Sequence, residues 1–173
     1  ADRQVPALLD PTFDAYRVLA WHLSSQWPKD GIVTVTGDNS TVAAAVAANL
    51  AAVLANDARV TLLVAADLAA VPVGRGRTMD VLPAGGREAP LGPAESQALV
   101  TEVQRAARRH DATIVVTTLA GAKRFRAGDD VVVCATQTRT RLATLARTVA
   151  SMIDEGARVR GVVGHQRVEA DQQ

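Results

Sequence analysis

Residues 32–51 read IVTVTGDNSTVAAAVAANLA, and this stretch decides the fold class. Residues 32–36 are a short β-branched run, which predicts a buried strand. Three residues then form a turn: Gly37, Asp38 and Asn39. Ser40 or Thr41 is expected to cap an Ala-rich helix that continues to residue 56. A buried strand that leads through a turn into a helix is the repeating unit of α/β proteins.

The same alternation continues on both sides of this stretch. Apolar residues recur at three- and four-residue steps between residues 12 and 25, which predicts an amphipathic helix with Thr12 as its N-cap. Further strands are expected at residues 60–65, 78–82, 113–118, 131–136 and 159–164, and further helices at 95–109 and 138–155. These strands are continuous apolar runs, which is typical of a parallel sheet covered by helices. We therefore expect a three-layer α/β fold, with a mostly parallel sheet of six or seven strands and helices on both faces.

The length and composition fit one domain with a single core. The chain has 173 residues, of which 48% are hydrophobic and only 3% aromatic. We expect an extended arm at residues 1–11, one domain at 12–168 and a short tail at 169–173. The formal net charge of +1 gives no global field toward nucleic acid or an anionic membrane. A single cysteine, Cys134, forms no internal disulfide and no zinc cluster, and no apolar run reaches the ~20 residues of a membrane span.

Four segments carry a resemblance to a known family. They read DAYRVLAWHL at residues 14–23, VAANLA at 46–51, LLVAADL at 62–68 and GARVRGVV at 156–163. In this order they resemble the partition-type P-loop ATPase superfamily, and within it the branch of bacterial tyrosine kinases and polysaccharide chain-length regulators. The resemblance spans residues 12–165. It implies a P-loop NTPase-like fold with a nucleotide site at the turn after the first strand.

The residues that this site requires are missing. In a P-loop, backbone N–H groups at a helix N-terminus bind phosphate, a Lys neutralises its charge and a Ser or Thr binds Mg²⁺. Counted back from Asn49, the family's Lys-Ser-Thr positions fall on three alanines: Ala43, Ala44 and Ala45. In a second possible alignment Ser40 and Thr41 match the Ser-Thr pair. That alignment puts Asn39 in place of the Lys, and Asp38 would repel the anion.

Two further family positions have also lost their charge. Ala65 stands where the resemblance places a catalytic aspartate after the second strand, so that only Asp67 remains of the Asp-x-Asp pattern, and Asp67 is expected to cap the next turn. Thr117 replaces the Walker B aspartate that supports Mg²⁺. We therefore expect an inactive pseudo-ATPase without cofactor or metal. The expected vestigial nucleotide site comprises Gly37, Asp38, Asn39, Ala43, Ala44, Ala45, Ala65, Asp67 and Thr117.

The expected role is protein–protein contact rather than catalysis. The resemblance implies a subunit interface on the first helix, with Asp14 and Arg17 as candidates, although Ala20 replaces the family's second arginine. Partners would be a second copy or an active protein of the same assembly, with no nucleic acid, because acids adjoin the basic residues. We expect a cytoplasmic location at the inner face of the cell membrane, attached only through a segment outside this chain. Two alternatives stay open: nucleotide binding without hydrolysis, and a stand-alone pseudo-ATPase that positions secretion or cell-surface machinery.

Overall fold

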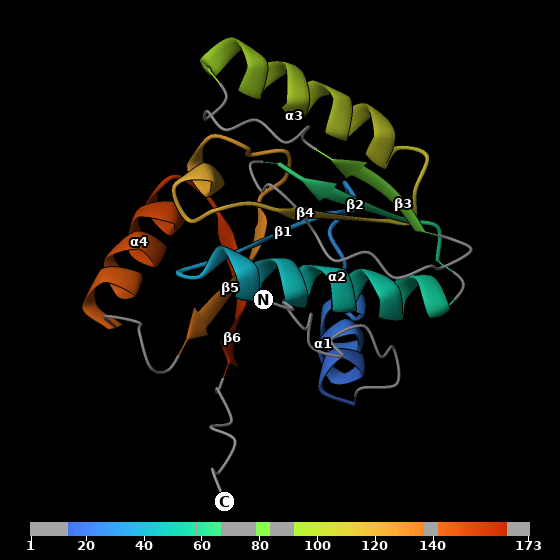
Figure 1. The fold of residues 1–173 in the computed structure, drawn as a ribbon, viewed down its shortest axis with the longest axis horizontal. Coiled ribbons are helices and arrows are strands. Elements are labelled where there is room, and N and C mark those ends of the chain that lie inside the picture. Colours follow the sequence, from blue (N-terminus) through green and yellow to red (C-terminus); the bar gives the residue numbers. More distant parts are fainter. Residues whose placement is uncertain (1–13, 58, 67–78, 84–91, 137–141, 166–173) are drawn as a thin grey trace, which may run out of the picture.

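The fold of residues 14–57, 59–66, 79–83, 92–136 and 142–165 is described by a computed structural model (Figure 1). Six parallel strands in these residues form one sheet in the order β3-β2-β4-β1-β5-β6. The strands are β1 (Ile32–Gly37), β2 (Thr61–Ala65), β3 (Met79–Pro83), β4 (Ala112–Val116), β5 (Asp130–Thr136) and β6 (Arg158–His165). The helices are α1 (Asp14–Ser24), α2 (Ser40–Asn56), α3 (Pro93–Ala107) and α4 (Leu142–Asp154), with a 3-10 turn at Gly121–Lys123. The expected α/β architecture is confirmed.

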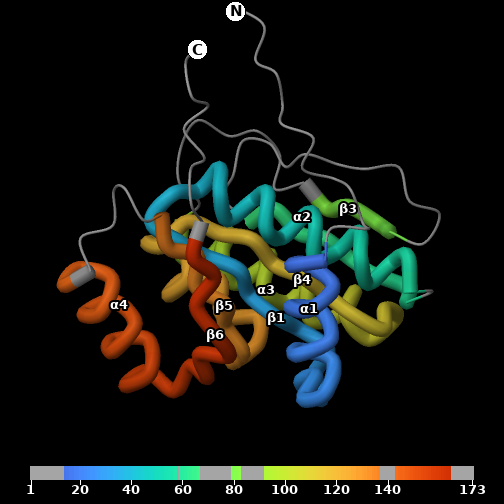
Figure 2. Tube along the Cα trace, turned by 90° about the horizontal axis from the view of Figure 1, so that it is seen from below, coloured from blue at the N-terminus to red at the C-terminus, as the bar shows by residue number. Residues whose placement is uncertain are grey.

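Helices cover both faces of the sheet. Figure 1 shows α1 and α2 on one side of the strands and α3 on the other. The buried residues agree, since Val33 and Val35 of β1 pack with α2, whereas Ile32 packs with α3. Helix α4 lies against Val131 and Val133 of β5, on the α3 side. The two edge strands, β3 and β6, lie on opposite sides of the central strands, and Figure 2 shows α4 outside β6.

Burial on both faces explains why the strands have no polar alternation. Every residue of β1, β2 and β4 is buried, and Val33 and Val35 are 0% exposed. The core between α2 and the sheet contains many alanines. Because these side chains are small, α2 lies close to the strands. A sheet of this kind is stabilised by apolar contacts on two sides.

Several predicted boundaries are corrected by the structure. The N-cap of α2 is Asn39 and not Ser40 or Thr41, because Asn39 has extended backbone angles and its side chain binds the first helical N–H groups. Gly37 is the buried last residue of β1 rather than part of the turn. Val60 precedes β2 and is 42% exposed, and α3 begins at Pro93. Proline is favoured in the first helical turn, where its missing N–H has no partner to lose.

Helix α4 ends at Asp154, one residue before the predicted end at residue 155. Gly156 follows the helix with φ of 91°, its N–H donates to the Ile153 carbonyl, and Ala157 N donates to the Met152 carbonyl. This left-handed ending favours glycine. The predicted starts at residues 12, 78 and 138, the arm at 1–11 and the tail at 169–173 lie outside the described residues. Within the described part of the chain, we find no helix long and apolar enough to span a bilayer.

Candidate functional site

The carboxyl ends of the parallel strands meet at one edge of the sheet, and α2 starts there. Ala65 at the end of β2 is paired with Val116 of β4, and Thr117 N donates to the Val35 carbonyl of β1 over 3.1 Å. The fold therefore brings Gly37, Ala65 and Thr117 to a common edge, as the resemblance implies. Asp67 lies outside the described residues. In α/β sheets this edge is where ligands bind.

The connection from β1 to α2 is short, and one of its side chains accepts hydrogen bonds from the N-terminus of α2. Only Asp38 and Asn39 separate the strand from the helix. Asn39 Oδ1 accepts hydrogen bonds from Thr41 N at 3.0 Å and Val42 N at 3.3 Å, and the Asn39 carbonyl accepts from Ala43 N. Helix N-terminal N–H groups are the ones that a phosphate-binding loop offers to its ligand. Here two of them are bound by the asparagine.

Asp38 adds a negative charge to the same turn. Its Oδ1 accepts from Thr136 N at 3.1 Å and from Thr136 Oγ1 at 3.3 Å, so it links the turn to the end of β5. The sequence contains no lysine between Gly37 and Asn49. The turn itself therefore supplies a carboxylate and no lysine.

The contact between β1 and β5 fixes Gly37. A Cβ atom at Gly37 would lie 2.5 Å from the Cys134 carbonyl oxygen and 2.9 Å from the Cys134 Cβ. Only glycine permits this approach of two backbones. Burial, and then the charge of Asp38, raise the pKa of the Cys134 thiol to about 12. The thiol is thus protonated at neutral pH and acts as a small apolar side chain.

The three alanines lie one turn further into α2. Ala43, Ala44 and Ala45 are buried, with exposures of 0%, 4% and 7%, and Ala43 and Ala44 belong to the core between α2 and the sheet. Ser40 and Thr41 occupy the first turn and are exposed. A ligand at the helix N-terminus would thus face the two hydroxyl side chains and not the alanines. Among the described residues, no group of three or more His, Cys, Asp or Glu side chains could hold a metal ion.

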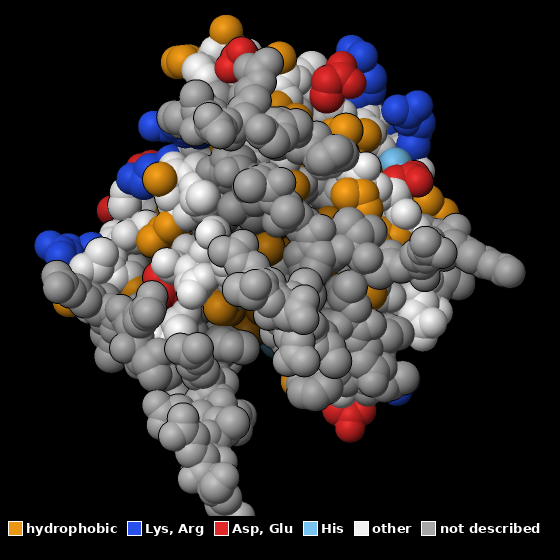
Figure 3. Space-filling view, viewed as in Figure 1, with side chains coloured by type: hydrophobic (Ala, Val, Ile, Leu, Met, Phe, Trp, Pro, Cys, Tyr) orange, Lys and Arg blue, Asp and Glu red, His pale blue; other side chains and the backbone are white. Residues whose placement is uncertain are grey.

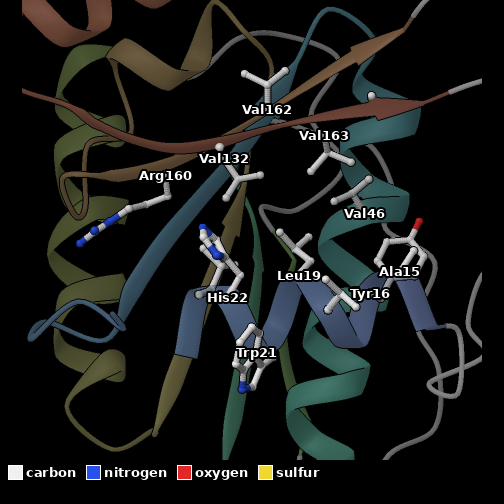
Figure 4. A pocket seen from close by; sticks show the side chains of 14 residues that line it. Ala15, Tyr16, Leu19, Trp21, His22, Val46, Val132, Arg160, Val162 and Val163 are labelled. Carbon is white, nitrogen blue, oxygen red and sulfur yellow. The ribbon is translucent and has the colours of Figure 1, made fainter. Parts of the chain in front are cut away.

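A hollow lies between α1 and β6, and the sequence did not predict it. This α1–β6 groove has a volume of about 470 Å³ (Figure 4). Val132, Val163 and Leu19 point into it, and His22 and Arg160 lie at one end. Its lining comes from Ala15, Tyr16, Val18, Leu19, Trp21, His22, Leu23, Val46, Val132, Arg160, Gly161, Val162, Val163 and Gly164. No acidic side chain is among them.

Strand β6, one wall of this groove, is held by a buried carboxylate. Asp130 is 0% exposed and accepts hydrogen bonds from Arg158 Nη2 at 2.8 Å and from Arg160 Nε. Arg160 also donates to Gln26 Oε1 at 3.0 Å, which joins β6 to the segment after α1. Burial alone would raise the pKa of Asp130, but the two arginines outweigh it and lower that pKa. The pairing fixes β6 where its ladder has a bulge, between Val131 and Val132.

The two interface candidates lie on the exposed side of α1. Asp14 and Arg17 are both exposed, while Ala20 and Leu23 are buried against α2 and the sheet. The basic residues around α3 and the 3-10 turn are mixed with acids, and three of them form ion pairs: Arg105–Glu102, Lys123–Glu155 and Arg126–Asp129. Figure 3 shows Lys and Arg side chains spread along the margin of one face, with Asp and Glu beside several of them. The expectation that nucleic acid is not a partner stays a prediction.

Comparisons with known proteins identify the fold. No protein-family model matches the sequence, and no curated protein matches it. Solved structures do match. The kinase domain of the Escherichia coli tyrosine kinase ETK has a TM-score of 0.72 at 18% identity, covering 92% of this chain and 77% of that one. The chimerical protein CapA2B2 has a TM-score of 0.72 at 17% identity, covering 92% and 86%. The VpsO kinase domain has a TM-score of 0.66 at 17% identity, covering 88% and 93%.

These matches support two statements of increasing detail. The chain has an α/β fold of the P-loop NTPase type. More particularly, it has the fold of bacterial tyrosine kinase domains, and two of these three solved structures are kinase domains by name. Identities of 17–18% establish the shared fold alone.

Sequence reasoning found the edge of the sheet but not the contacts that close it. The bond from Asp38 to Thr136 joins residues 98 positions apart, and neither residue type signals it. Trp21 did carry a signal, because it falls outside the apolar stripe of its helix, and the structure leaves it 75% exposed. An aromatic side chain on the polar side of an amphipathic helix is a candidate for an interface.

Proposed function

We propose that this domain is a catalytically inactive pseudo-ATPase that acts through protein contacts in cell-envelope polysaccharide biosynthesis or chain-length control. The observation that carries the proposal is the β1–α2 turn. Asn39 binds the N–H groups of Thr41 and Val42, and the preceding residue of the turn, Asp38, carries a carboxylate that binds Thr136. Both groups favour a turn without a phosphate.

The free energies of the contacts at this turn also disfavour phosphate binding. Each charge-assisted contact to a phosphate contributes about 1.5–3 kcal/mol, and the lysine that makes the main one is absent. A phosphate that displaced Asn39 would also remove a helix cap worth about 1 kcal/mol. It would then lie next to Asp38, where like charges repel. Binding through the N-terminus of α2 alone is weak by comparison.

The polysaccharide role rests on the family resemblance, together with the shared fold of bacterial tyrosine kinase domains. The domain would lie in the cytoplasm at the inner membrane face, attached through a segment outside this chain. Its partner would be a second copy or an active protein of the same assembly. Replacing the domain in the cell should change the length distribution of the surface polysaccharide on a gel. An unchanged distribution would contradict this role.

Two alternatives remain. Nucleotide binding without hydrolysis is favoured by the exposed hydroxyl groups of Ser40 and Thr41 at the N-terminus of α2. A stand-alone pseudo-ATPase that positions secretion or cell-surface machinery is distinguished by the gene. Two hydrophobic spans encoded upstream would favour the polysaccharide role over this alternative.

Thermal unfolding with ATP or ADP, with and without Mg²⁺, tests the inactive site. A ligand that binds only the native state at 100 times its Kd stabilises it by about 2.7 kcal/mol. We expect no saturable rise in Tm. A saturable rise that Mg²⁺ enlarges, and that Ser40→Ala with Thr41→Ala removes, would overturn the proposal. Asp38→Asn is the matched variant, since it removes the repelling charge while an oxygen acceptor for Thr136 stays in place.

A further inference from the structure

Strand β3 lies at the margin of the sheet and, among the described strands, pairs with β2 alone. Its side chains alternate, since Met79 and Val81 pack on the α2 side and Leu82 packs on the α3 side. Asp80 is on the same side as Leu82, so its side chain lies toward α3. An edge strand has a backbone ladder on one side only, so its side-chain contacts matter more for its local stability.

The side chain of Asp80 contacts His110, in the turn between α3 and β4. His110 Nε2 lies 2.9 Å from Asp80 Oδ2, and His110 Nδ1 lies 2.7 Å from the carbonyl oxygen of Ala106, near the end of α3. The His110 side chain is only 10% exposed, whereas that of Asp80 is 73% exposed. A carbonyl and a carboxylate can only accept hydrogen bonds. Both ring nitrogens therefore face acceptors.

Further charged side chains lie on the turn of His110 or beside the cavity of about 510 Å³ that it lines: Arg108, Arg109 and Asp111 on the turn, Lys29 and Asp30 before β1, and Arg59 before β2. The carboxylates of Asp30 and Asp111 each accept a hydrogen bond from a backbone N–H group, at 3.1 and 2.9 Å. Of these side-chain types, histidine is the one that ordinarily changes charge between pH 5 and 8. His110 is thus the titrating group of this cluster, and Asp80 is the acid bonded to it.

The protonation state of His110 decides how many of its two contacts can form. An imidazolium ring donates through both nitrogens, but a neutral imidazole has one N–H group and one lone pair. In the neutral ring, one of the two contacts would place a lone pair against an oxygen. The Ala106 carbonyl is fixed in the backbone of α3, whereas the exposed Asp80 side chain can turn into water. The neutral ring therefore keeps its proton on Nδ1, toward Ala106, and Asp80 is the partner that leaves.

We propose that His110 is a pH-sensitive tie that holds β3 to the end of α3. The protonated ring donates to Ala106 and Asp80 together, and the neutral ring releases Asp80. The margin of the sheet at β3 then loosens as pH rises through the range in which histidine titrates. An ion pair with one exposed member contributes modestly, so the change is local and the central strands keep their stability. This inference does not rest on the proposed function, and the two can fail separately.

Nuclear magnetic resonance tests both parts of the proposal. Between pH 5 and 8, the His110 ring should change from two protonated nitrogens to a proton on Nδ1 alone. Over the same range, the amide protection factors of β3, corrected for the intrinsic pH dependence of exchange, should fall about threefold to fivefold. The protection factors of β1 and β4 should show no such fall.

Asp80→Asn is the deciding variant. The asparagine amide can accept from the imidazolium ring and can donate to the lone pair of the neutral ring, so it stays bonded in both states. The fall in β3 protection should therefore disappear. His110→Phe keeps a ring without nitrogen and should give low β3 protection at both pH values. His22→Gln and His165→Gln are the matched controls, because they remove the other two histidines of the chain and should leave the fall in place.

Three results would overturn the proposal. A neutral His110 ring with its proton on Nε2 would mean that Asp80 is the partner that stays. Wild-type β3 protection that is constant with pH would mean that the contact does not hold the strand. A fall that persists in Asp80→Asn would assign the titration to another group. If His110→Phe does not fold, Asp80→Asn still decides, since its side chain lies largely in solvent.

Discussion

Two glycines mark how differently the carboxyl edge and the α1–β6 groove are built. At Gly37 a Cβ atom would lie 2.5 Å from the Cys134 carbonyl oxygen, whereas at Gly161 it would meet no atom of the described residues within 4 Å. The carboxyl edge is closed by the chain's own groups, Asn39 and Asp38 among them. The groove is an apolar surface left open. Hydrogen bonds within the chain thus occupy the carboxyl edge, whereas the groove keeps an uncovered apolar surface.

The largest expected loss of stability comes from substituting Gly37, and Gly161 is its direct comparison. Gly37→Ala should destabilise the protein by about 3 kcal/mol, because the new methyl group meets the backbone of a central strand, which cannot move aside. Gly161→Ala should change stability by no more than about 0.5 kcal/mol. Urea unfolding measures both. Equal losses of unfolding free energy would show that the backbone is packed no more closely at Gly37 than at Gly161.

Asp130, which anchors the β6 wall of the groove, should give the next largest effect. Asp130→Asn is expected to cost about 2 kcal/mol at neutral pH, less than a fully buried pair would, since Arg158 and Arg160 are partly exposed and can rehydrate. The folded pKa of Asp130 is lowered, so its contribution is present above the unfolded value of about 3.9 and is lost as pH falls through the folded value.

The measurement is the difference in unfolding free energy between wild type and Asp130→Asn as a function of pH. The difference should be constant near neutral pH and shrink in acid. Asp129→Asn is the control, because Asp129 forms an exposed pair with Arg126 that contributes about 1 kcal/mol or less. A difference that grows toward acid would contradict the assigned direction.

At the edge, the cap of α2 should give a moderate effect. Asn39→Ala should cost about 1 kcal/mol in chemical unfolding, and Asn39→Asp should retain most of the stability because aspartate also caps helices. Ser40→Ala should be nearly neutral. If Ser40→Ala proved the costlier change, Ser40 would be the cap in solution.

The smallest expected change in stability is that of Trp21→Ala, beside the α1–β6 groove. Trp21→Ala should alter the stability of the monomer by no more than about 0.5 kcal/mol, since the indole is largely in solvent. Leu23→Ala, on the buried side of the same helix, should cost about 2–5 kcal/mol. Thermal unfolding at a concentration where the chain is monomeric compares them. A large loss for Trp21→Ala would mean that its ring packs within its own chain.

The fold could be predicted because its signals are local. Strands β1, β2 and β4 are runs without charged residues, and α1 and α3 have apolar residues at helical spacing, so their alternation can be recognised without knowing any contact. The cap of α2 could not be assigned, because Asn39, Ser40 and Thr41 are all good N-caps and the end of β1 decides among them. The link from Asp38 to Thr136 and the anchoring of β6 by Asp130 join distant residues. Such pairs follow from the topology, not from local sequence.

Cys134 makes the close contact between β1 and β5 accessible to measurement by thiol labelling. It is the chain's only cysteine, it lies buried behind Gly37, and burial is the first cause that raises its thiol pKa to about 12. Alkylating reagents attack the thiolate, so the native protein should resist them while the unfolded chain reacts. The rate of labelling would then report how often β1 and β5 separate, and the molecule needs no added probe for that measurement.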